Sequence, residues 1–310
     1  MTAPHAIRVE NLGKQFAGVT AVDDVSFSVA PGELFGLIGP DGAGKTTTVR
    51  MLASIMDPTA GDAWVTGRHT VREAEKVKED ISYMSQRFGL YPDLTVQENI
   101  DFYADIYGIG KKERRERIDR LLAFSNLTPF RQRLAGKLSG GMKQKLGLAC
   151  ALIHTPAVLF LDEPTNGVDP VSRRDFWRIL HQLLEEGVTI FVTTAYLDEA
   201  DRCHRVGLID KGRLLACDTP ANLRKLMKSN ILEIITTDSR KAVALLREKL
   251  TGESISLFGA RIHVTTATPE PTASRISSLL REEGISLQSM REVEPNLEDV
   301  FVSVLSEERR

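Results

Sequence analysis

A glycine-rich stretch near the start of the chain, GPDGAGKTT (residues 39–47), has the spacing G-x-x-x-x-G-K-[ST]. It follows the apolar run LFGLI and precedes an apolar segment, residues 46–56, that we expect to be a helix. In that context, glycines let successive backbone amides point at phosphate oxygens, and the start of the helix adds partial positive charge. We therefore expect a phosphate-binding loop made of Gly39, Pro40, Asp41, Gly42, Ala43, Gly44, Lys45, Thr46 and Thr47.

Two side chains of this loop and two acids further along the chain have the types that phosphoryl transfer needs. Lys45 would reach the terminal phosphates, and Thr46 would offer a hydroxyl to Mg²⁺. The apolar run VLFLDEP (residues 158–164) ends in Asp162 and Glu163. A buried strand that ends in acids places them at the carboxyl edge of a sheet, beside the phosphate loop. Asp162 suits the Mg²⁺ shell, and Glu163 is placed to orient or deprotonate the attacking water.

A second stretch, LSGGMKQ (residues 138–144), also has the character of an anion-binding helix start. Ser139 can cap a helix, and Gly140 and Gly141 leave the first amides of that helix bare. A chain that already has one phosphate loop does not need a second anion site for the same nucleotide. We therefore expect this stretch to serve a nucleotide that is bound to another subunit.

Together these motifs resemble the ATPase subunit of an ABC transporter: GPDGAGKTT its Walker A loop, VLFLDEP its Walker B strand and LSGGMKQ its signature. Gln86 in YMSQRFGLYPDLTVQEN resembles the Q-loop glutamine, and Asp169 in NGVDP resembles the D-loop aspartate. Phe16 in KQFAGVTAVDDVSF stands where the family places an aromatic ring against adenine. The resemblance covers roughly residues 6–225, with the motifs in the family's order.

The resemblance implies an α/β P-loop NTPase fold of the ABC type, with a RecA-like core, an antiparallel β subdomain and a helical subdomain near residues 87–153. It implies ATP and Mg²⁺ as cofactors, and a head-to-tail dimer that holds ATP between one subunit's Walker A loop and the other's signature. The catalytic residues would then be Glu163, Gln86 and Lys45, and the metal-binding residues Thr46, Gln86 and Asp162. Further nucleotide-binding residues would be Phe16, Ser139, Gly140, Gly141, Gln144 and Asp169.

One position departs from the family pattern. The sequence predicts a buried strand over residues 190–193, followed by an acidic helix, and in the family a histidine that contacts the γ-phosphate follows this strand. Here that residue is Ala195. Because Glu163 is present, we expect weakened rather than absent chemistry. We hypothesise either pairing with a second, histidine-bearing ATPase domain or a slow site used mainly for ATP-gated closure. The natural context TTAYLDEA favours a native alanine over an engineered one.

The elements that must position these residues follow from the pattern of apolar runs. Short strands are expected over residues 6–38, helices over 87–153, and a strand-rich core again from AVLFLDEP onward. From residue 229 the pattern changes to a β-α-β-α-β order without catalytic motifs, typical of a small α+β domain. We expect an ATP-binding domain over residues 1–228 and an accessory domain over residues 229–310.

Composition limits the class of partner. The chain has 310 residues, 42% of them hydrophobic, and a formal charge of −2, which argues against nucleic acid as the main partner. Its three cysteines are isolated, so neither a disulfide framework nor a zinc site is expected. No segment is long and apolar enough for a membrane span or a signal peptide, which predicts a cytoplasmic protein that acts at the membrane through a partner.

The segments RFGLYPDLTVQENIDFYADIYG and LAGKLSGGMKQKLGLACALI resemble the exporter ATPases of the ABC-2, multidrug-type class. The tail, ending in EPNLEDVFVSVL, resembles the small C-terminal domain that many of those subunits carry. That resemblance implies an ABC-2 type transmembrane permease as partner, peripheral attachment to the cytoplasmic face of the membrane, and either a homodimer or a heterodimer with a second ABC ATPase domain.

Other nucleotide-binding classes fit less well. Chromosome-organising and DNA-repair ABC ATPases place a long coiled coil between Walker A and the signature, and here Ser139 follows Gly44 by only 95 positions (139 − 44). ABC translation factors carry two such domains in one chain, and small-molecule kinases and GTPases have no use for LSGGMKQ. A nucleotide-regulated binding module with weak turnover remains an alternative because of Ala195.

Overall fold

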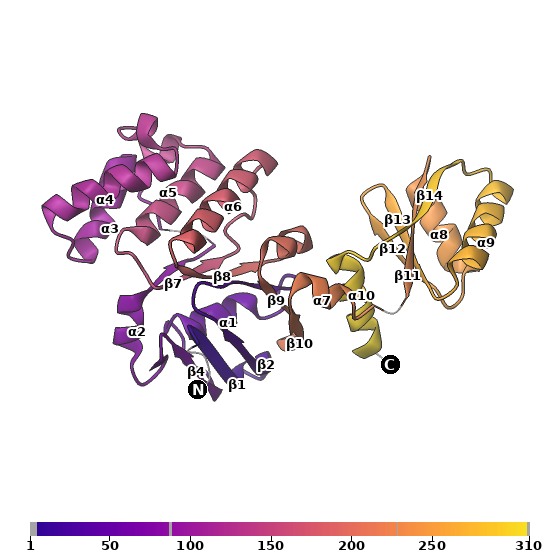
Figure 1. Ribbon diagram of the computed structural model, residues 1–310, viewed down its shortest axis with the longest axis horizontal. Helices are drawn as coiled ribbons and strands as arrows, with labels where there is room; N and C mark the ends of the chain where they lie inside the picture. The colour runs from indigo at the N-terminus through magenta and orange to yellow at the C-terminus, as the bar shows by residue number, and fades with distance from the viewer. Residues whose placement is uncertain (1–4, 87–88, 228, 309–310) are drawn as a thin grey trace. The chain divides into compact units, whose positions relative to one another are not determined.

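The computed structural model describes residues 5–86, 89–227 and 229–308 (Figure 1). Backbone contacts group the chain into two compact units, Met1–Thr219 and Pro220–Arg310. The division falls nine residues before the change of sequence pattern at residue 229 (228 − 219). In the described part of the chain, no helix combines the length and apolar character that a membrane crossing requires.

The first unit contains two sheets. One is antiparallel, in the order β2-β1-β4-β5; the other has the order β10-β9-β3-β8-β7-β6 and is parallel except where β10 pairs with β9. The strands are β1 Ile7–Phe16, β2 Val19–Val29, β3 Leu34–Ile38, β4 Ala60–Val65, β5 Arg68–His69, β6 Ile81–Met84, β7 Val158–Asp162, β8 Thr189–Thr194, β9 Arg205–Asp210 and β10 Arg213–Asp218.

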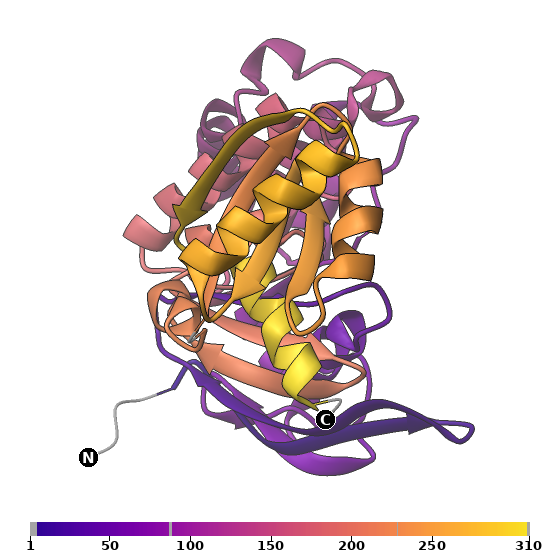
Figure 2. The same ribbon diagram turned by 90° about the vertical axis from the view of Figure 1, so that its right-hand side faces the viewer.

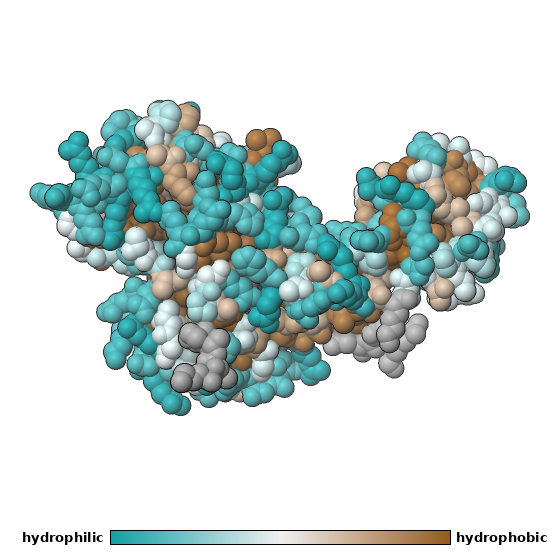
Figure 3. Space-filling view, viewed as in Figure 1, coloured by the Kyte–Doolittle hydropathy of each residue, from teal (hydrophilic) through white to brown (hydrophobic). Residues whose placement is uncertain are grey.

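Helices surround these sheets and also lie between them. Helix α1 contacts strands of both sheets, and α3, α4 and α5 share a hydrophobic cluster of their own, the expected helical subdomain. The charged sequence of α4 makes a hydrophilic surface on the face seen in Figure 3. The helices are α1 Lys45–Leu52, α2 Ala74–Asp80, α3 Val96–Ile106, α4 Lys111–Phe124, α5 Gly140–Leu152 and α6 Pro170–Glu185, with 3₁₀ turns η1 Thr128–Phe130, η2 Ala135–Lys137 and η3 Leu197–Arg202.

Two of these elements differ from the sequence predictions. The acidic helix expected after Ala195 is only the 3₁₀ turn η3. Helix α1 ends at Leu52 rather than at residue 56, because the chain turns at Ser54, which has a φ of 56°.

The core of the first unit lies between the two sheets. The rings of Phe27 in β2, Phe35 in β3 and Phe191 in β8 stack with centroids 5.1 to 5.8 Å apart. Every residue of β3, β7 and β8 is buried. Parallel strands covered on both faces are uniformly apolar, so only their last residues can present polar groups to a site.

The second unit is a βαββαβ fold of the ferredoxin-like type, with an added helix at each end. Its antiparallel sheet has the order β12-β13-β11-β14, and α8 and α9 cover one face while α10 lies at the other (Figures 1 and 2). The elements are α7 Pro220–Arg224, β11 Asn230–Thr236, α8 Ser239–Lys249, β12 Ser254–Phe258, β13 Arg261–Thr266, α9 Pro269–Glu282, β14 Leu287–Val293 and α10 Leu297–Glu308.

The predicted β-α-β-α-β order for this unit was wrong by one strand, β12. The segment SISLF is short, carries two serines and forms the edge of the sheet, so only Ile255 in it is buried. It pairs with β13 across a two-residue turn at Gly259 and Ala260. A short edge strand buries too little apolar surface to stand out in a pattern analysis.

A buried cluster attaches α10 to the sheet. Nδ1 of His263 in β13 lies 2.9 Å from Oδ1 of Asp299 in α10, and its Nε2 lies 3.6 Å from Oε2 of Glu233 in β11. Burial alone would lower the pKa of His263, but the hydrogen bonds and charges of Asp299 and Glu233 together raise it above its usual value. The cluster explains why two acids and a histidine are buried here without forming a catalytic site.

Candidate functional site

Four neighbouring parallel strands, β3-β8-β7-β6, end at the same edge of the large sheet. The phosphate loop follows β3, Ala195 follows β8, Glu163 follows β7, and Gln86 lies two residues beyond β6. The carboxyl ends of parallel strands form the usual ligand-binding edge of such sheets. The predicted placement of the acids beside the phosphate loop is confirmed by the contacts described next.

The phosphate loop needs glycine for two reasons. Gly42 and Gly44 have φ of 78° and 102°, a region that favours glycine. A Cβ at Gly39 would lie 2.0 Å from the carbonyl oxygen of Ile209, and one at Gly44 would lie 2.5 Å from that of Ala21. Gly42 faces open space, and the first turn of α1 has no side-chain cap. This bare backbone before a helix start fits a phosphate group.

Lys45 is held inside the loop, with only 3% of its side chain exposed. Its Nζ donates hydrogen bonds to the carbonyl oxygens of Gly39 (2.8 Å) and Pro40 (2.9 Å) and lies 3.0 Å from Oε1 of Glu163. A buried ammonium group requires such partners because removing it from water is costly. A phosphate in the loop would compete with Glu163 for Lys45 and so release the carboxylate.

Asp162 ends β7 with a buried carboxylate that accepts three hydrogen bonds. Its Oδ1 accepts from the hydroxyls of Thr46 (3.0 Å) and Thr193 (2.8 Å), and its Oδ2 accepts from the hydroxyl of Tyr83 (3.2 Å). Burial raises the pKa of Tyr83, and the charge of Asp162 raises it further. The contact between Thr46 and Asp162 joins the phosphate loop directly to the end of β7.

This hydroxyl and carboxylate are the hard oxygen ligands that Mg²⁺ takes in proteins, so the residues present fit that metal. Within residues 5–86, 89–227 and 229–308, no group of three or more His, Cys, Asp or Glu could hold a metal ion by itself. In phosphate sites Mg²⁺ is commonly held through one or two protein oxygens, with phosphate and water as the other ligands.

Glu163 has a backbone φ of 48°, which is uncommon for a residue other than glycine. Its N–H donates to the carbonyl oxygen (3.1 Å) and to the hydroxyl oxygen (3.0 Å) of Thr193 on β8. Its Oε2 accepts hydrogen bonds from the amide groups of Gln86 (3.1 Å) and Asn166 (3.3 Å). The carboxylate is therefore held on one side by Lys45 and on the other by two amides.

Asn166, Thr193 and Tyr83 belong to the site although no sequence motif indicated them. Asn166 lies in a turn closed by a hydrogen bond from its N–H to the carbonyl oxygen of Glu163 (3.2 Å). Thr193 and Tyr83 lie near the carboxyl ends of β8 and β6, the two neighbours of β7. Polar residues at the ends of buried strands were the available signal, but they become informative only once the strand order is known.

Ala195 lies beside Glu163 on a small cavity of about 160 Å³. The other lining residues are Asp41, Asn166, Thr194 and Tyr196. The methyl group of Ala195 offers no hydrogen-bond donor to this cavity, whereas Asn166 and Tyr196 carry groups that can donate. The guanidinium group of Arg173 lies over the ring of Tyr196, 4.3 Å from its centroid.

The signature segment forms the start of α5, and its predicted cap is confirmed: the hydroxyl of Ser139 accepts a hydrogen bond from the N–H of Met142 (3.3 Å). The two glycines differ. A Cβ at Gly140 would meet nothing within 4 Å, but one at Gly141 would lie 2.3 Å from the side chain of Ser172 in α6. Gly141 therefore lets α5 and α6 pack closely, and Gly140 alone keeps an open surface next to the helix start.

The remaining predicted residues have local roles. Oδ1 of Asp169 caps α6 by accepting from the N–H groups of Val171 (3.1 Å) and Ser172 (3.0 Å), and these hydrogen bonds lower the pKa of Asp169. Ser172 also packs against the start of α5, so the signature and Asp169 lie at adjacent helix starts.

Phe16 and Gln144 are not joined to the phosphate loop by any hydrogen bond or ring contact found among the described residues. Phe16 is 42% exposed at the end of β1, with Nζ of Lys14 5.2 Å from its ring centroid. Gln144 is half-buried in α5. Their expected contacts with nucleotide stay predictions.

The fold and the site define a P-loop nucleotide-binding protein with a second glycine-bearing helix start, and comparison with known proteins identifies its family. The ABC transporter family matches residues 22–166. The chain is 33% identical to a daunorubicin resistance ATP-binding protein of Streptomyces coeruleorubidus, over 96% of this chain and 94% of that protein. It is 37% identical to the Nod factor export ATP-binding protein I of Burkholderia thailandensis, over 97% of each. The chain belongs to the ATP-binding proteins of ABC transporters, whose nucleotide-binding domain is an ABC-type ATPase.

Further matches agree with this family. A probable multidrug ABC transporter ATP-binding protein of Escherichia coli is 40% identical over 96% of this chain, which spans 52% of that protein's length. Among solved structures, an ATP-binding subunit of an ABC transporter superposes with a TM-score of 0.65 at 28% identity, covering 71% of this chain and 92% of that one. A dimeric ATP-binding cassette in a post-hydrolysis state with ADP and Pi has a TM-score of 0.63 at 26% identity, covering 69% and 98%. The predicted ABC-type fold is confirmed.

Proposed function

We propose that this chain binds and hydrolyses Mg-ATP to drive export through a separate membrane subunit. The observation that carries the proposal is the position of the Glu163 carboxylate, 3.0 Å from Lys45 and beside the contact between Thr46 and Asp162. A general base then lies where the loop would hold the terminal phosphate. The names of the relatives, which refer to multidrug transport, daunorubicin resistance and Nod factor export, support the direction of transport.

The residues of the site would divide the work. The loop amides and Lys45 bind phosphate oxygens, and Thr46, Asp162 and Gln86 hold Mg²⁺, which when bound offsets negative charge on those oxygens. Glu163, once Lys45 has moved to the phosphate, orients the attacking water and accepts its proton. The amide groups of Gln86 and Asn166 keep the carboxylate of Glu163 in place for that step.

The second part of the proposal is ATP-driven, head-to-tail dimerisation. The open surface at Gly140, next to the capped helix start at Ser139, supports binding of a nucleotide carried by another subunit. Gln144 and Asp169 would complete that contact. The partner is a second copy of this chain or a histidine-bearing ATPase domain, and the dimer works on the cytoplasmic face of the membrane with an ABC-2 type permease.

A second function is favoured by one observation, the alanine at residue 195. A site without a donor at this position suits a nucleotide-regulated binding module in which ATP closes the dimer and turnover is slow. Steady-state ATP hydrolysis, measured with and without the membrane partner, separates the two functions. Hydrolysis stimulated by the partner supports the exporter, and ATP binding without stimulated hydrolysis supports the binding module.

Replacing Lys45 by alanine should weaken ATP affinity by about 10- to 100-fold, because charge-assisted hydrogen bonds to phosphate are lost. Isothermal titration of the variant with Mg-ATP measures the effect, and circular dichroism checks the fold, since Glu163 loses the ammonium group that pairs with its carboxylate. Lys112→Ala, an exposed position on α4, is the matched control. An unchanged affinity in a folded Lys45→Ala protein would remove the central claim.

The second unit contains none of the proposed site residues, and we propose that it tunes dimerisation or coupling. A chain ending at Thr219, where backbone contacts divide, should bind ATP within about threefold of the full chain, because every residue proposed to bind ATP lies in the first unit. The shortened chain should be compared with the full chain by titration with Mg-ATP. A folded fragment without ATP binding would show that this unit has a direct role in the site.

A further inference from the structure

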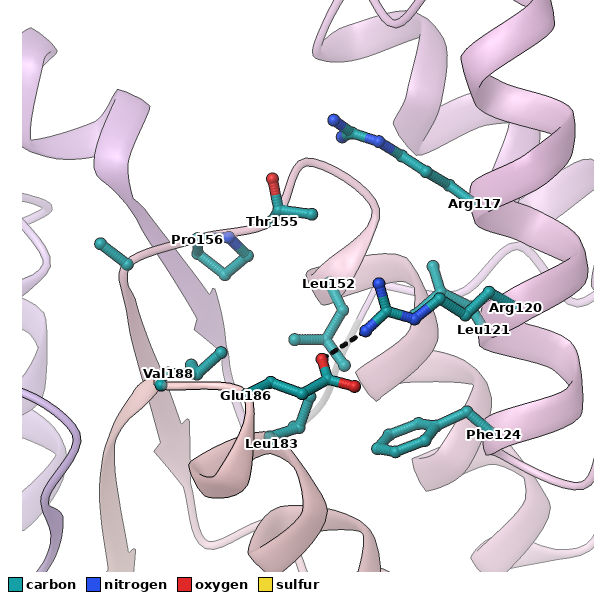
Figure 4. Close-up of a pocket in the computed structure, with 12 residues that line it drawn as sticks. Arg117, Arg120, Leu121, Phe124, Leu152, Thr155, Pro156, Leu183, Glu186 and Val188 are labelled. Carbon is teal, nitrogen blue, oxygen red and sulfur yellow. Dashed lines mark ion pairs between the residues drawn. The ribbon is translucent and has the colours of Figure 1, made fainter.

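A cleft of about 550 Å³ opens at the end of the large sheet opposite to the nucleotide edge (Figure 4). Ala157 and Val188 line it just before β7 and β8 begin, whereas Glu163 and Ala195 follow the other ends of these strands. One five-residue strand separates the two edges, about 16 Å of extended chain. The cleft is therefore distinct from the proposed ATP site.

The floor of the cleft is apolar and comes from three elements. Leu121 and Phe124 project from α4, Leu152 lies at the end of α5, and Leu183 lies on α6 (Figure 4). Leu152 and Leu183 are buried, while Leu121 and Phe124 are half-buried and so keep apolar surface towards the opening. Clefts of 300–1,000 Å³ with an apolar floor and a few polar groups are typical sites for small molecules.

The charged side chains that line the cleft are two arginines and one glutamate. Arg117 and Arg120 stand on the α4 wall, and Glu186, beyond the end of α6, is the single acid among the lining residues. Arg117 already has partners: its guanidinium donates to the carbonyl oxygen of Ile153 (2.7 Å) and to Glu113 (2.5 Å).

The guanidinium group of Arg120 is accessible to a ligand. It pairs with Glu186 at 2.5 Å, but the two side chains are 66% and 43% exposed. Exposed ion pairs contribute little free energy, so a ligand can replace Glu186 at little cost. Because Glu113 already pairs with Arg117, Arg120 is the lining cation whose partner a ligand can replace, and a single negative charge on the ligand would take the place of the Glu186 carboxylate.

We propose that this cleft binds a compact amphipathic monoanion, with its apolar body on Leu121, Phe124 and Leu183 and its carboxylate or sulfonate group at Arg120. Charge complementarity identifies the ligand class. A polyanion such as ATP would leave most of its charge unmatched, and a neutral ligand would give Arg120 no partner in place of Glu186. The proposal does not depend on ATP hydrolysis.

The probe for the test is anilinonaphthalene sulfonate, whose fluorescence rises in apolar surroundings, titrated into the full-length protein. Decanoate, with a linear apolar body, and 1-naphthoate, with an aromatic one, serve as competing carboxylates. Decanol has the same chain length as decanoate without its charge and is the neutral control. Arg120→Glu should weaken probe binding about five- to tenfold. Leu121→Trp, which fills the cleft, should weaken it at least as much. Arg115→Glu, an exposed charge reversal on the same helix that does not line the cleft, should leave it unchanged.

ATP affinity measured on the same samples reports whether each variant is folded. Displacement of the probe by decanoate or 1-naphthoate, but not by decanol or ATP, supports the proposal. The stronger competitor shows whether a linear or an aromatic body fits the cleft. Equal probe binding by Arg120→Glu, Leu121→Trp and the unmodified protein would overturn it. Displacement by decanol as strong as by decanoate would overturn the role of Arg120. If the cleft of the isolated protein held a polypeptide and excluded the probe, the proposal would also be overturned.

Discussion

Replacing Glu163 by glutamine should slow ATP hydrolysis by about 10²- to 10⁴-fold, the range that a positioned general base contributes. ATP affinity should stay the same or rise. The carboxylate of Glu163 lies 3.0 Å from Lys45, and a neutral amide in its place would compete less with phosphate for the ammonium group. Steady-state hydrolysis and Mg-ATP titration of the purified variant measure both effects. Glu116→Gln, an exposed position on α4, is the matched control.

The same variant tests dimerisation, because ATP that is bound and not cut should hold two subunits together. Sedimentation with saturating ATP should then show a dimer. The structure offers a sharp control at the signature: a side chain at Gly140 would meet nothing within 4 Å, whereas one at Gly141 would lie 2.3 Å from Ser172. Adding Gly140→Asp to Glu163→Gln should therefore leave the fold and ATP binding intact and abolish the dimer, since the carboxylate would face the other subunit's phosphate.

Two outcomes would count against head-to-tail dimerisation. One is a Glu163→Gln protein that stays monomeric with ATP, both alone and with its natural partner. The other is a dimer that persists in the doubly substituted protein, because that dimer would not use the signature surface.

The phosphate loop, the acidic strand end and the capped signature helix were predictable because each is a local pattern. The motif in GPDGAGKTT requires glycine at Gly39, where a Cβ would meet the carbonyl oxygen of Ile209, and at Gly44, where φ is positive. The apolar run before Asp162 must be a buried strand. The strand order was not predictable from local pattern alone. It places β8 between β3 and β7, which is why Thr193 could hold both Asp162 and the backbone of Glu163 without being noticed in the sequence.

Other features depend on close packing, which no local pattern reports. The sequence pattern indicated that Gly141 exposes a backbone amide. In the structure, the atom nearest to a Cβ at Gly141 would belong to Ser172, in a helix that begins almost thirty residues later (170 − 141). The edge strand β12 buries one side chain and gave no clear signal. Helix α7 belongs to the second unit, whose boundary lies at Thr219, and it contacts α10, the helix at the other end of that unit's sequence.

Replacing Ala195 by histidine should raise the maximal rate of ATP hydrolysis by up to about 10²- to 10³-fold, the usual loss when one preorganised transition-state donor is removed. Ala195 lines the cavity of about 160 Å³ that Glu163 and Asn166 also border, so an imidazole there would add a donor beside the general base. ATP affinity should change little, because the added contact matters mostly in the transition state. Steady-state kinetics over a range of ATP concentrations separate the two quantities.

The control for this gain is Ala195→Leu, which adds similar bulk without a donor and should not raise the rate. Combining Ala195→His with Glu163→Gln should return hydrolysis to the low level of the glutamine variant, because a donor at residue 195 does not replace the base. A homodimer of the unmodified protein lacks the donor in both sites, so histidine should help it most. An unmodified protein that alone hydrolyses ATP rapidly, and gains nothing from Ala195→His, would show that other groups of this cavity, such as Asn166 or Tyr196, already supply the missing contact.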